Sequence, residues 1–129
     1  MQLRWLKGEF SICQVPDFSH VDMEQAMWFA ARRHDERSLL CEREHVPCNA
    51  LQCEHGYCGF EVVGQLDFSL IGILAGISTA LAQARVSILA QSTFDTDCVF
   101  LKAAQRRTAV QALQRAGYTF AQEMDDGAL

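Results

Sequence analysis

Short apolar runs separated by turn-forming residues predict β-strands through the first half of the chain. Strand-like runs occupy four segments, at 2–6, 9–15, 27–31 and 38–41. Lys7-Gly8 separates the first two runs, and the charged stretch 33–37 separates the last two. Residues 42–58 have no regular pattern and are expected to be irregular. A further strand is predicted at 60–63, ended by Gly64.

The second half combines helical and strand-like spacing. Ser69 is a suitable N-cap for a helix whose apolar positions share one face, at Leu70, Ile73, Leu74, Ile77 and Leu81. Strands are predicted at 86–90, 98–101 and 118–120. A second helix over 103–116 should turn four residues inward, namely Ala109, Val110, Leu113 and Ala116, and end at Gly117.

From residue 60 onward the predicted order is therefore strand, helix, strand, strand, helix, strand. This is the ferredoxin-like βαββαβ order. The segment from Trp28 to Glu42 repeats the strand, charged turn and strand of Ser87 to Lys102. We therefore expect an α+β protein of two related units in tandem with mainly antiparallel sheets. The expected boundaries are a degenerate unit at 1–59, a regular unit at 60–122 and a tail at 123–129.

Composition and charge narrow the possible functions. Among 129 residues, half are apolar, and 16 Asp and Glu stand against 11 Lys and Arg without a basic cluster. Nucleic-acid binders carry such a cluster, so we expect no nucleic-acid partner. The opening MQLRWLKGEF lacks the apolar core of a secretory signal, and the longest apolar run, 70–82, is too short for a bilayer. The expected location is the cytoplasm, with no membrane association.

Sequence motifs of catalysis are missing. Neither Ser69 nor Ser92 lies in a GxSxG-type motif, and the chain has no phosphate-binding glycine loop. We expect a protein that is not an enzyme and that needs no cofactor.

A possible amino-acid site follows from the predicted topology. The amides of a helix N-terminus at 71–74 suit a carboxylate, and Gly72 would let a ligand approach the backbone. Asp95 or Asp97 would suit an ammonium group. Because the first and third strands of a βαββαβ unit are neighbours, the helix entry and the turn before strand three should meet. The alternatives are an ordinary Asp-Thr turn and, for Gly72 and Gly76, close helix packing.

The six cysteines allow a second hypothesis. Cys13, Cys41 and Cys98 lie in apolar runs, where a thiol packs as a small hydrophobe. Cys48, Cys53 and Cys58, with His45 and His55, are residue types that bind zinc. Their even spacing contains no CxxC pair, so we expect a loop with exposed histidines and partly buried thiols and no bound metal. A zinc- or redox-responsive loop remains the alternative.

Two segments resemble the ACT-domain superfamily. They are VGQLDFSLIGILA at 63–75 and SILAQSTFDTD at 87–97, and the likeness is specific over about residues 60–118. Within that superfamily the chain is similar to small tandem-ACT proteins related to cytosolic arginine sensors. The resemblance implies an allosteric sensor that acts on an assembly or a protein partner. Because ferredoxin-like units expose edge strands, we expect a homo-oligomer such as a dimer.

The resemblance also implies a ligand-binding set. Its members come from the helix entry and the turn: Ser69, Leu70, Ile71, Gly72, Ile73, Leu74, Thr93, Phe94, Asp95, Thr96 and Asp97. The implied function is non-catalytic binding of a small molecule, an amino acid in most relatives. The alternative is an interaction module with a vestigial pocket. Arg85 stands where relatives often have Gly, and a left-handed backbone there would cost about 1–2 kcal/mol.

Overall fold

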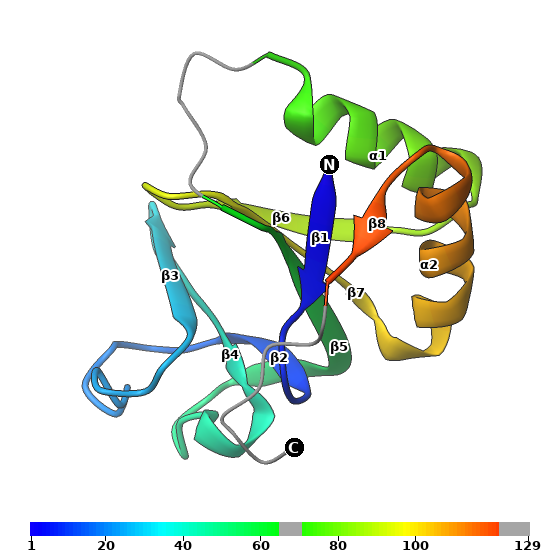
Figure 1. Cartoon of the computed structure of the whole chain (residues 1–129). Coiled ribbons are helices and arrows are strands. Elements are labelled where there is room, and N and C mark those ends of the chain that lie inside the picture. Colours follow the sequence, from blue (N-terminus) through cyan, green and yellow to red (C-terminus); the bar gives the residue numbers. More distant parts are fainter. Residues whose placement is uncertain (65–70, 122–129) are drawn as a thin grey trace. The chain divides into compact units, whose positions relative to one another are not determined.

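The computed structural model describes residues 1–64 and 71–121 (Figure 1). The chain divides into two compact units. We call Met1–Lys7 together with the residues from Cys58 onward the helical unit, and Gly8–Tyr57 the strand unit. Strand β5, Gln52–Val62, contributes residues to both. The expected tail at 123–129 lies outside the described residues.

The helical unit is a mixed sheet with two helices. Its elements, besides the end of β5, are β1 Gln2–Trp5, α1 Ile73–Gln83, β6 Ile88–Ser92, β7 Asp97–Lys102, α2 Arg106–Arg115 and β8 Thr119–Phe120. Its strand order is β6-β7-β5-β1-β8. The β6–β7 and β1–β5 pairs are antiparallel, and the β1–β8 pair is parallel. The predicted neighbourhood of β5 and β7 is confirmed.

The strand order departs from the predicted ferredoxin-like arrangement at one place. From β5 to β8 the elements follow the expected order, but the N-terminal strand β1 lies where the last strand would pair with the first. Leu3 is the register partner of Val62 on one side and of Phe120 on the other. The apolar run at the chain start therefore completes this sheet, because burying Leu3 and Trp5 there removes two large apolar side chains from water.

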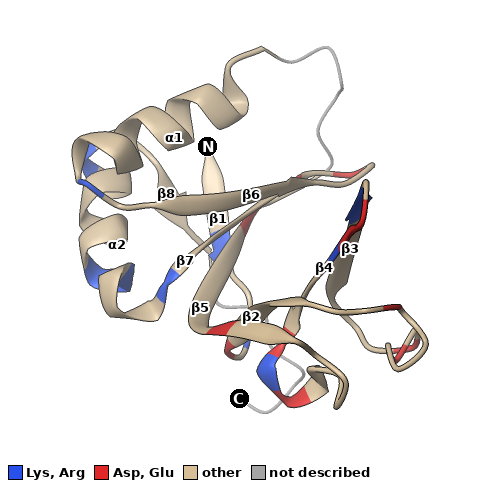
Figure 2. Cartoon of the chain, turned by 180° about the vertical axis from the view of Figure 1, so that it is seen from behind, with Lys and Arg blue, Asp and Glu red and all other residues tan. Residues whose placement is uncertain are grey.

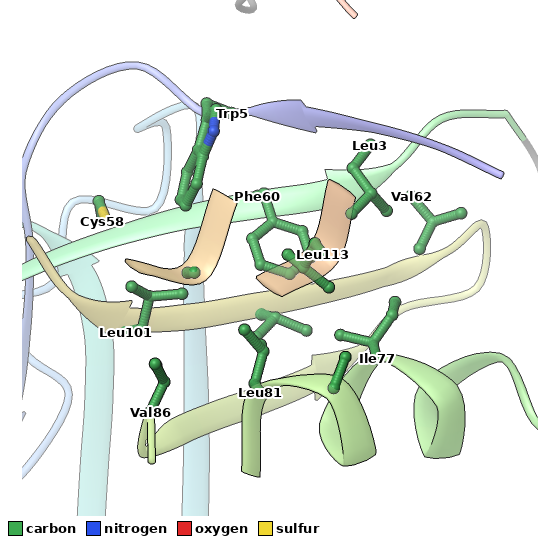
Figure 3. Close-up of a cluster of buried hydrophobic side chains, with 13 residues drawn as sticks. Leu3, Trp5, Cys58, Phe60, Val62, Ile77, Leu81, Val86, Leu101 and Leu113 are labelled. Carbon is green, nitrogen blue, oxygen red and sulfur yellow. The ribbon is translucent and has the colours of Figure 1, made fainter. Parts of the chain in front are cut away.

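One core holds the helical unit together (Figure 3). Helix α1 contributes Ile77 and Leu81, and α2 contributes Leu113, all fully buried. They pack against strand residues that include Val62 and Leu101. Each such side chain contributes about 1.5–3 kcal/mol of burial free energy. The helical spacing predicted for both helices is therefore confirmed at these positions.

Aromatic rings extend this core. The Trp5 ring meets Phe60 edge-on with 5.3 Å between centroids and stacks on Phe120 at 5.7 Å. The guanidinium of Arg106 lies 4.3 Å from the centroid of the Trp5 ring, a cation–π contact. These contacts tie β1, β5, β8 and α2 to one another.

Helix α1 begins later than predicted. Its N-cap is Gly72, whose φ of 83° is left-handed, so the right-handed helix starts only at Ile73. Ser69, the predicted cap, lies outside the described residues. Gly76 has a different role: a Cβ there would lie 2.7 Å from the Tyr118 hydroxyl, so close helix packing explains this glycine.

Helix α2 is preceded by a 3-10 turn, Ala103–Gln105, and the two together cover 103–115 of the predicted 103–116. Ala116 was predicted to face inward, and this prediction is wrong, because Ala116 is the exposed C-cap. Gly117 has φ 99°, as expected for the residue after a helix C-cap.

The strand unit contains four antiparallel strands in the order β3-β4-β2-β5. They are β2 Phe10–Gln14, β3 Trp28–Arg33, β4 Glu36–Glu42 and the first residues of β5, with a 3-10 turn at Arg43–His45. No α-helix occurs within residues 8–57, so the tandem arrangement of two βαββαβ units is not confirmed. The expectation of an irregular 42–58 is wrong for β5, whose partner strand β2 is distant in the sequence.

A second core lies on one face of the strand unit. Its buried members are Cys13, Val21, Leu39 and Cys41. Trp28 and Cys53 are partly buried against them. Cys13 and Cys41 are therefore packing residues, as predicted, and Cys98 is likewise buried, in the helical unit. In the part of the chain that the structure describes, no helix has the length and apolar character needed to cross a membrane.

Candidate functional site

The turn between β6 and β7 is closed by its own two threonines. The Thr93 amide donates to the Thr96 carbonyl at 2.8 Å, and the Thr93 hydroxyl donates to the same oxygen at 3.1 Å. The Thr96 amide donates back to the Thr93 hydroxyl at 3.2 Å. The turn therefore has a defined backbone in which Phe94 and Asp95 form the exposed tip.

A further hydrogen bond connects this turn to the end of β5. The Thr96 hydroxyl donates to the Val62 carbonyl at 2.9 Å. Val62 is the last residue of the strand from which the chain continues toward α1. The turn before β7 is thereby held beside the C-terminal end of β5.

The two aspartates of the turn differ in their surroundings. The Asp97 carboxylate accepts a hydrogen bond from the Ser92 hydroxyl at 2.7 Å, across a register pair of the hairpin. Asp95 is exposed at the tip. Among residues 1–64 and 71–121, neither carboxylate takes part in an ion pair. The ammonium group of a ligand could therefore bind Asp95 without displacing a Lys, Arg or His side chain from an ion pair.

The helix entry offers backbone donors. The amides of Ile73, Leu74 and Ala75 open α1 and have no carbonyl partner within the helix. The side chains of Ile73 and Leu74 pack against the core, so these residues offer only backbone groups to a ligand. Ile71, just before the helix, is 94% exposed. Ser69 and Leu70 lie outside the described residues.

Charge is unevenly distributed in the helical unit (Figure 2). Its described carboxylates beyond residue 58 are Glu61, Asp95 and Asp97, and Glu61 pairs with Arg4 at 3.0 Å. Helix α2 instead carries three arginines, Arg106, Arg107 and Arg115. In Figures 1 and 2 the N-terminal end of α1 and the β6–β7 turn lie at the same end of the unit, away from α2.

The cysteine–histidine group that was the alternative reading of the sequence is not assembled. Cys48 is exposed, Cys58 is buried in the helical core, and Cys53 packs in the strand unit. His55 is bonded to the buried Ser11, with 2.6 Å between Nδ1 and Oγ. Among the residues that the structure describes, these cysteines belong to no group whose ligand atoms are close enough together to share a metal ion.

Sequence reasoning missed two features of the strand unit. Glu42, Glu44 and His45 are the described residues whose ligand atoms all lie within 4.8 Å of one another. An open hollow of about 380 Å³ is lined by residues of β2, β4 and β5. Neither feature includes a residue of the predicted ligand set. The adjacent EREH letters could have drawn attention to the first, whereas the hollow depends on strand pairing.

Burial keeps several thiols protonated at neutral pH. It raises the pKa of Cys13 to about 12, and the pKa values of Cys41 and Cys98 to about 11. The buried thiols therefore behave as small apolar groups.

One carboxylate of the strand unit has a lowered pKa. Arg43 donates a hydrogen bond to Glu9 and lowers the pKa of the Glu9 carboxyl.

Comparisons with known proteins connect this architecture to a family. Residues 52–115 match the family model of the ACT domain. No curated protein matches the chain. The segment matched begins with β5 and ends with α2, so it contains both segments on which the sequence resemblance was based.

Solved structures extend the likeness to nearly the whole chain. A protein from Agrobacterium tumefaciens has a TM-score of 0.85 at 22% identity, covering 96% of this chain and 94% of that one. The regulatory subunit of aspartate kinase from Thermus thermophilus has a TM-score of 0.63 at 11% identity, with coverages of 89% and 96%. Clostridium acetobutylicum aspartate kinase gives 0.64 at 16%, covering 88% of this chain and 33% of the kinase. At identities of 22% or less, these TM-scores show a shared fold and no more. The protein therefore has an ACT-like α+β fold in which residues 52–115 match the ACT domain.

Proposed function

We propose that this protein is a non-catalytic regulatory protein that binds a free amino acid between the helix entry 69–74 and the turn 93–97. The observation that carries the proposal is the hydrogen bond from Thr96 to Val62. It holds an acidic turn beside the strand end that leads to the helix entry. An amino-acid zwitterion has a carboxylate that suits the helix entry and an ammonium group that suits the acidic turn.

The chemistry of the two sides is complementary to an amino acid. The opening amides of α1 and the helix dipole favour the α-carboxylate. Asp95, exposed and outside every ion pair of the described residues, favours the α-ammonium through a charge-assisted hydrogen bond. The match of residues 52–115 to the ACT domain supports the regulatory part of the proposal, because structures that share this fold include a regulatory subunit of aspartate kinase.

The mechanism we propose is a population shift. A ligand that bridges the helix entry and the turn favours the arrangement in which both face it, and thereby changes a contact with a second copy or a partner protein. Within residues 1–64 and 71–121, β6 and β8 of the helical unit each pair with one strand only, and an unpaired strand edge favours such pairing.

A thermal-denaturation screen tests the proposal directly. The full chain is heated with each proteinogenic amino acid, including arginine because of the resemblance to arginine sensors. Ligand at 100 times its Kd stabilises the native state by about 2.7 kcal/mol, which raises Tm measurably. The α-amide and the N-acetyl derivative of the stabilising amino acid serve as controls, since each lacks one of the two charges.

We expect one amino acid or a small group to raise Tm, and both derivatives to lose the effect. A panel without any stabilising member would contradict the proposal. It would favour the second candidate, an interaction module with a vestigial pocket. The observation that favours an interaction module is the exposure of two apolar side chains, Ile71 at 94% and Phe94 at 74%.

A further inference from the structure

Three thiols that are distant in the sequence gather on one face of the strand unit. Cys13 lies on β2, Cys41 on β4 and Cys53 on β5. All three belong to the same core, in which Cys53 packs against the buried Cys13 and Cys41. The thiols are free, so chemistry between them is available.

Strand register separates the two possible cysteine pairs. Cys13 and Cys53 are direct partners across the antiparallel β2–β5 pair. Partners in such a pair have Cα atoms about 4.5–5.5 Å apart, which lies within the range of disulfides. Cys41 instead faces Ser11, while Cys13 faces Leu39, so Cys13 and Cys41 are diagonal neighbours. Diagonal positions are about 7–8 Å apart, beyond the distance that a disulfide spans without backbone movement.

Exposure decides which thiol reacts first. Cys53 is partly exposed, whereas Cys13 is 3% exposed and Cys41 fully buried. Both Cys13 and Cys53 also line the open hollow of the strand unit. A small reagent in solvent therefore reaches Cys53 before Cys13, and Cys13 is the thiol already in contact with it.

We propose that Cys53 and Cys13 form a site of reversible thiol modification, at which a low-molecular-weight disulfide is reduced and a cross-strand protein disulfide is formed. The Cys53 thiol loses its proton to water, and its sulfur attacks one sulfur of the reagent. The reagent S–S bond breaks, and a mixed disulfide remains on Cys53. The departing thiolate takes a proton from solvent.

The second step uses the neighbouring thiol. Cys13 loses its proton to water and attacks the Cys53 sulfur, which forms the Cys13–Cys53 bond and breaks the mixed disulfide. The second reagent thiolate leaves and is protonated. The two protein thiols have then supplied two electrons, and one disulfide reagent has become two thiols. Because burial keeps Cys13 protonated at neutral pH, this second step is the slow one.

The test uses oxidised glutathione on the full chain in a Cys48→Ser background, since Cys48 is an exposed thiol. After reaction, free thiols are alkylated under denaturing conditions, and peptides are mapped by mass spectrometry with and without prior reduction. We expect Cys13 and Cys53 in one cross-linked peptide pair, and alkylated Cys41, Cys58 and Cys98. Reduction should restore both thiols, and the cross-linked protein should melt at a higher temperature.

Two further variants in that background distinguish the roles. Cys13→Ala should stop the reaction at glutathione on Cys53, whereas Cys41→Ser should form the Cys13–Cys53 cross-link as before. Thermal melts confirm that each variant is folded before it is treated. A cross-link between Cys13 and Cys41, a Cys53 that stays glutathionylated beside a free Cys13, or an unreactive Cys53 would each overturn the proposal. All these outcomes are independent of amino-acid binding.

Discussion

The hydroxyl of Thr96 donates a hydrogen bond of 2.9 Å to the carbonyl of Val62, which joins two residues 34 positions apart. The bond connects the turn before β7 to the end of β5, two segments that the strand order brings to the same edge of the sheet. Replacing Thr96 therefore tests the local geometry on which the proposed ligand site depends.

We expect Thr96→Val to lower the free energy of unfolding by about 1 kcal/mol, because valine has the same shape but cannot donate to Val62. Thr96→Ser keeps the hydroxyl and is the matched control. Urea denaturation measures both variants. If a ligand has been found, Thr96→Val should also reduce the Tm increase that it produces. Equal stability of the two variants would mean that the hydrogen bond contributes nothing.

The proposed ammonium contact predicts an effect of Asp95→Asn. Removal of one charge-assisted hydrogen bond costs about 1.5–3 kcal/mol, so the affinity for the stabilising amino acid should fall by roughly tenfold or more. Asp35→Asn makes the same chemical change in the exposed turn of the β3–β4 hairpin, and should leave affinity unchanged. Calorimetric titration of both variants provides the comparison. Equal affinities would exclude Asp95 from the site.

Arg85 has φ 62°, the left-handed conformation considered for this position from the sequence. We expect Arg85→Gly to raise the free energy of unfolding by about 1 kcal/mol, since the left-handed conformation costs a non-glycine residue about 1–2 kcal/mol and glycine gains some unfolded-state entropy. Arg85→Ala removes the same exposed side chain and keeps the strain, so its stability should stay near that of the parent. Urea denaturation measures the free energy of unfolding of both variants, and the m-values should stay unchanged. If both variants were stabilised, the cause would be the Arg85 side chain and not the backbone conformation.

Gly59 lies against the ring of the fully buried Phe100. A Cβ at residue 59 would meet two ring carbons closer than real Cβ atoms approach. Gly59→Ala should therefore lower stability by about 1–3 kcal/mol through overpacking.

A second substitution tests whether the ring is the cause. In the presence of Phe100→Leu the added methyl meets less obstruction, so the two changes together should cost less than the sum of the single costs. Urea denaturation of the four proteins in this cycle measures the coupling. Strict additivity would contradict a clash between these two residues.

Glu9 predicts a pH effect. Its carboxylate pairs with Arg43 at 3.0 Å and accepts from the Gly56 amide at 2.9 Å, contacts that hold the pKa of Glu9 below its ordinary 4.5. A carboxyl whose pKa is lowered in the native state contributes stability above its unfolded pKa. That contribution is lost as the pH falls through the lowered native value.

The Glu9→Gln variant should therefore be less stable than the parent at neutral pH, and the difference should shrink below pH 4.5. Urea denaturation across the acidic range at low salt measures it. A pH-independent difference between the two proteins would show that packing, and not the charge of Glu9, is responsible.

Local pattern was sufficient for the regular elements. The period of apolar positions predicted the core faces of both helices, including Ile77, Leu81 and Leu113, because helix burial repeats at the spacing of the helix itself. The same method failed at β5, where Gln52, Cys53, Glu54 and His55 carry too little apolar character to indicate a strand. Their strand conformation depends on hydrogen bonding to β2, which no local window contains.

The geometry of the candidate site could be predicted only in part from the sequence pattern. The turn before β7 was expected from its composition, and so was the neighbourhood of β5 and β7, which follows from element order. The start of α1 was not predicted correctly, because the spacing of apolar residues continues on both sides of Gly72. It therefore gives no sign of the left-handed backbone that delays the helix to Ile73. The bond between Thr96 and Val62 has no sequence signal, since a threonine in a turn is compatible with many partners.

By itself, the sequence determined the secondary elements with clear periodicity, the ACT-like class of the fold, and the burial of Cys13, Cys41 and Cys98. The elements and the cysteine burial depend on residue type and on spacing within a few positions, whereas the ACT-like class was indicated by the resemblance of 63–75 and 87–97 to that superfamily. Tertiary structure alone decided that β1 lies between β5 and β8, and that Cys53 faces Cys13 while Cys48 stands apart. Such relations depend on strand pairing and register, and pairing joins residues whose separation along the chain carries no information about their distance in space.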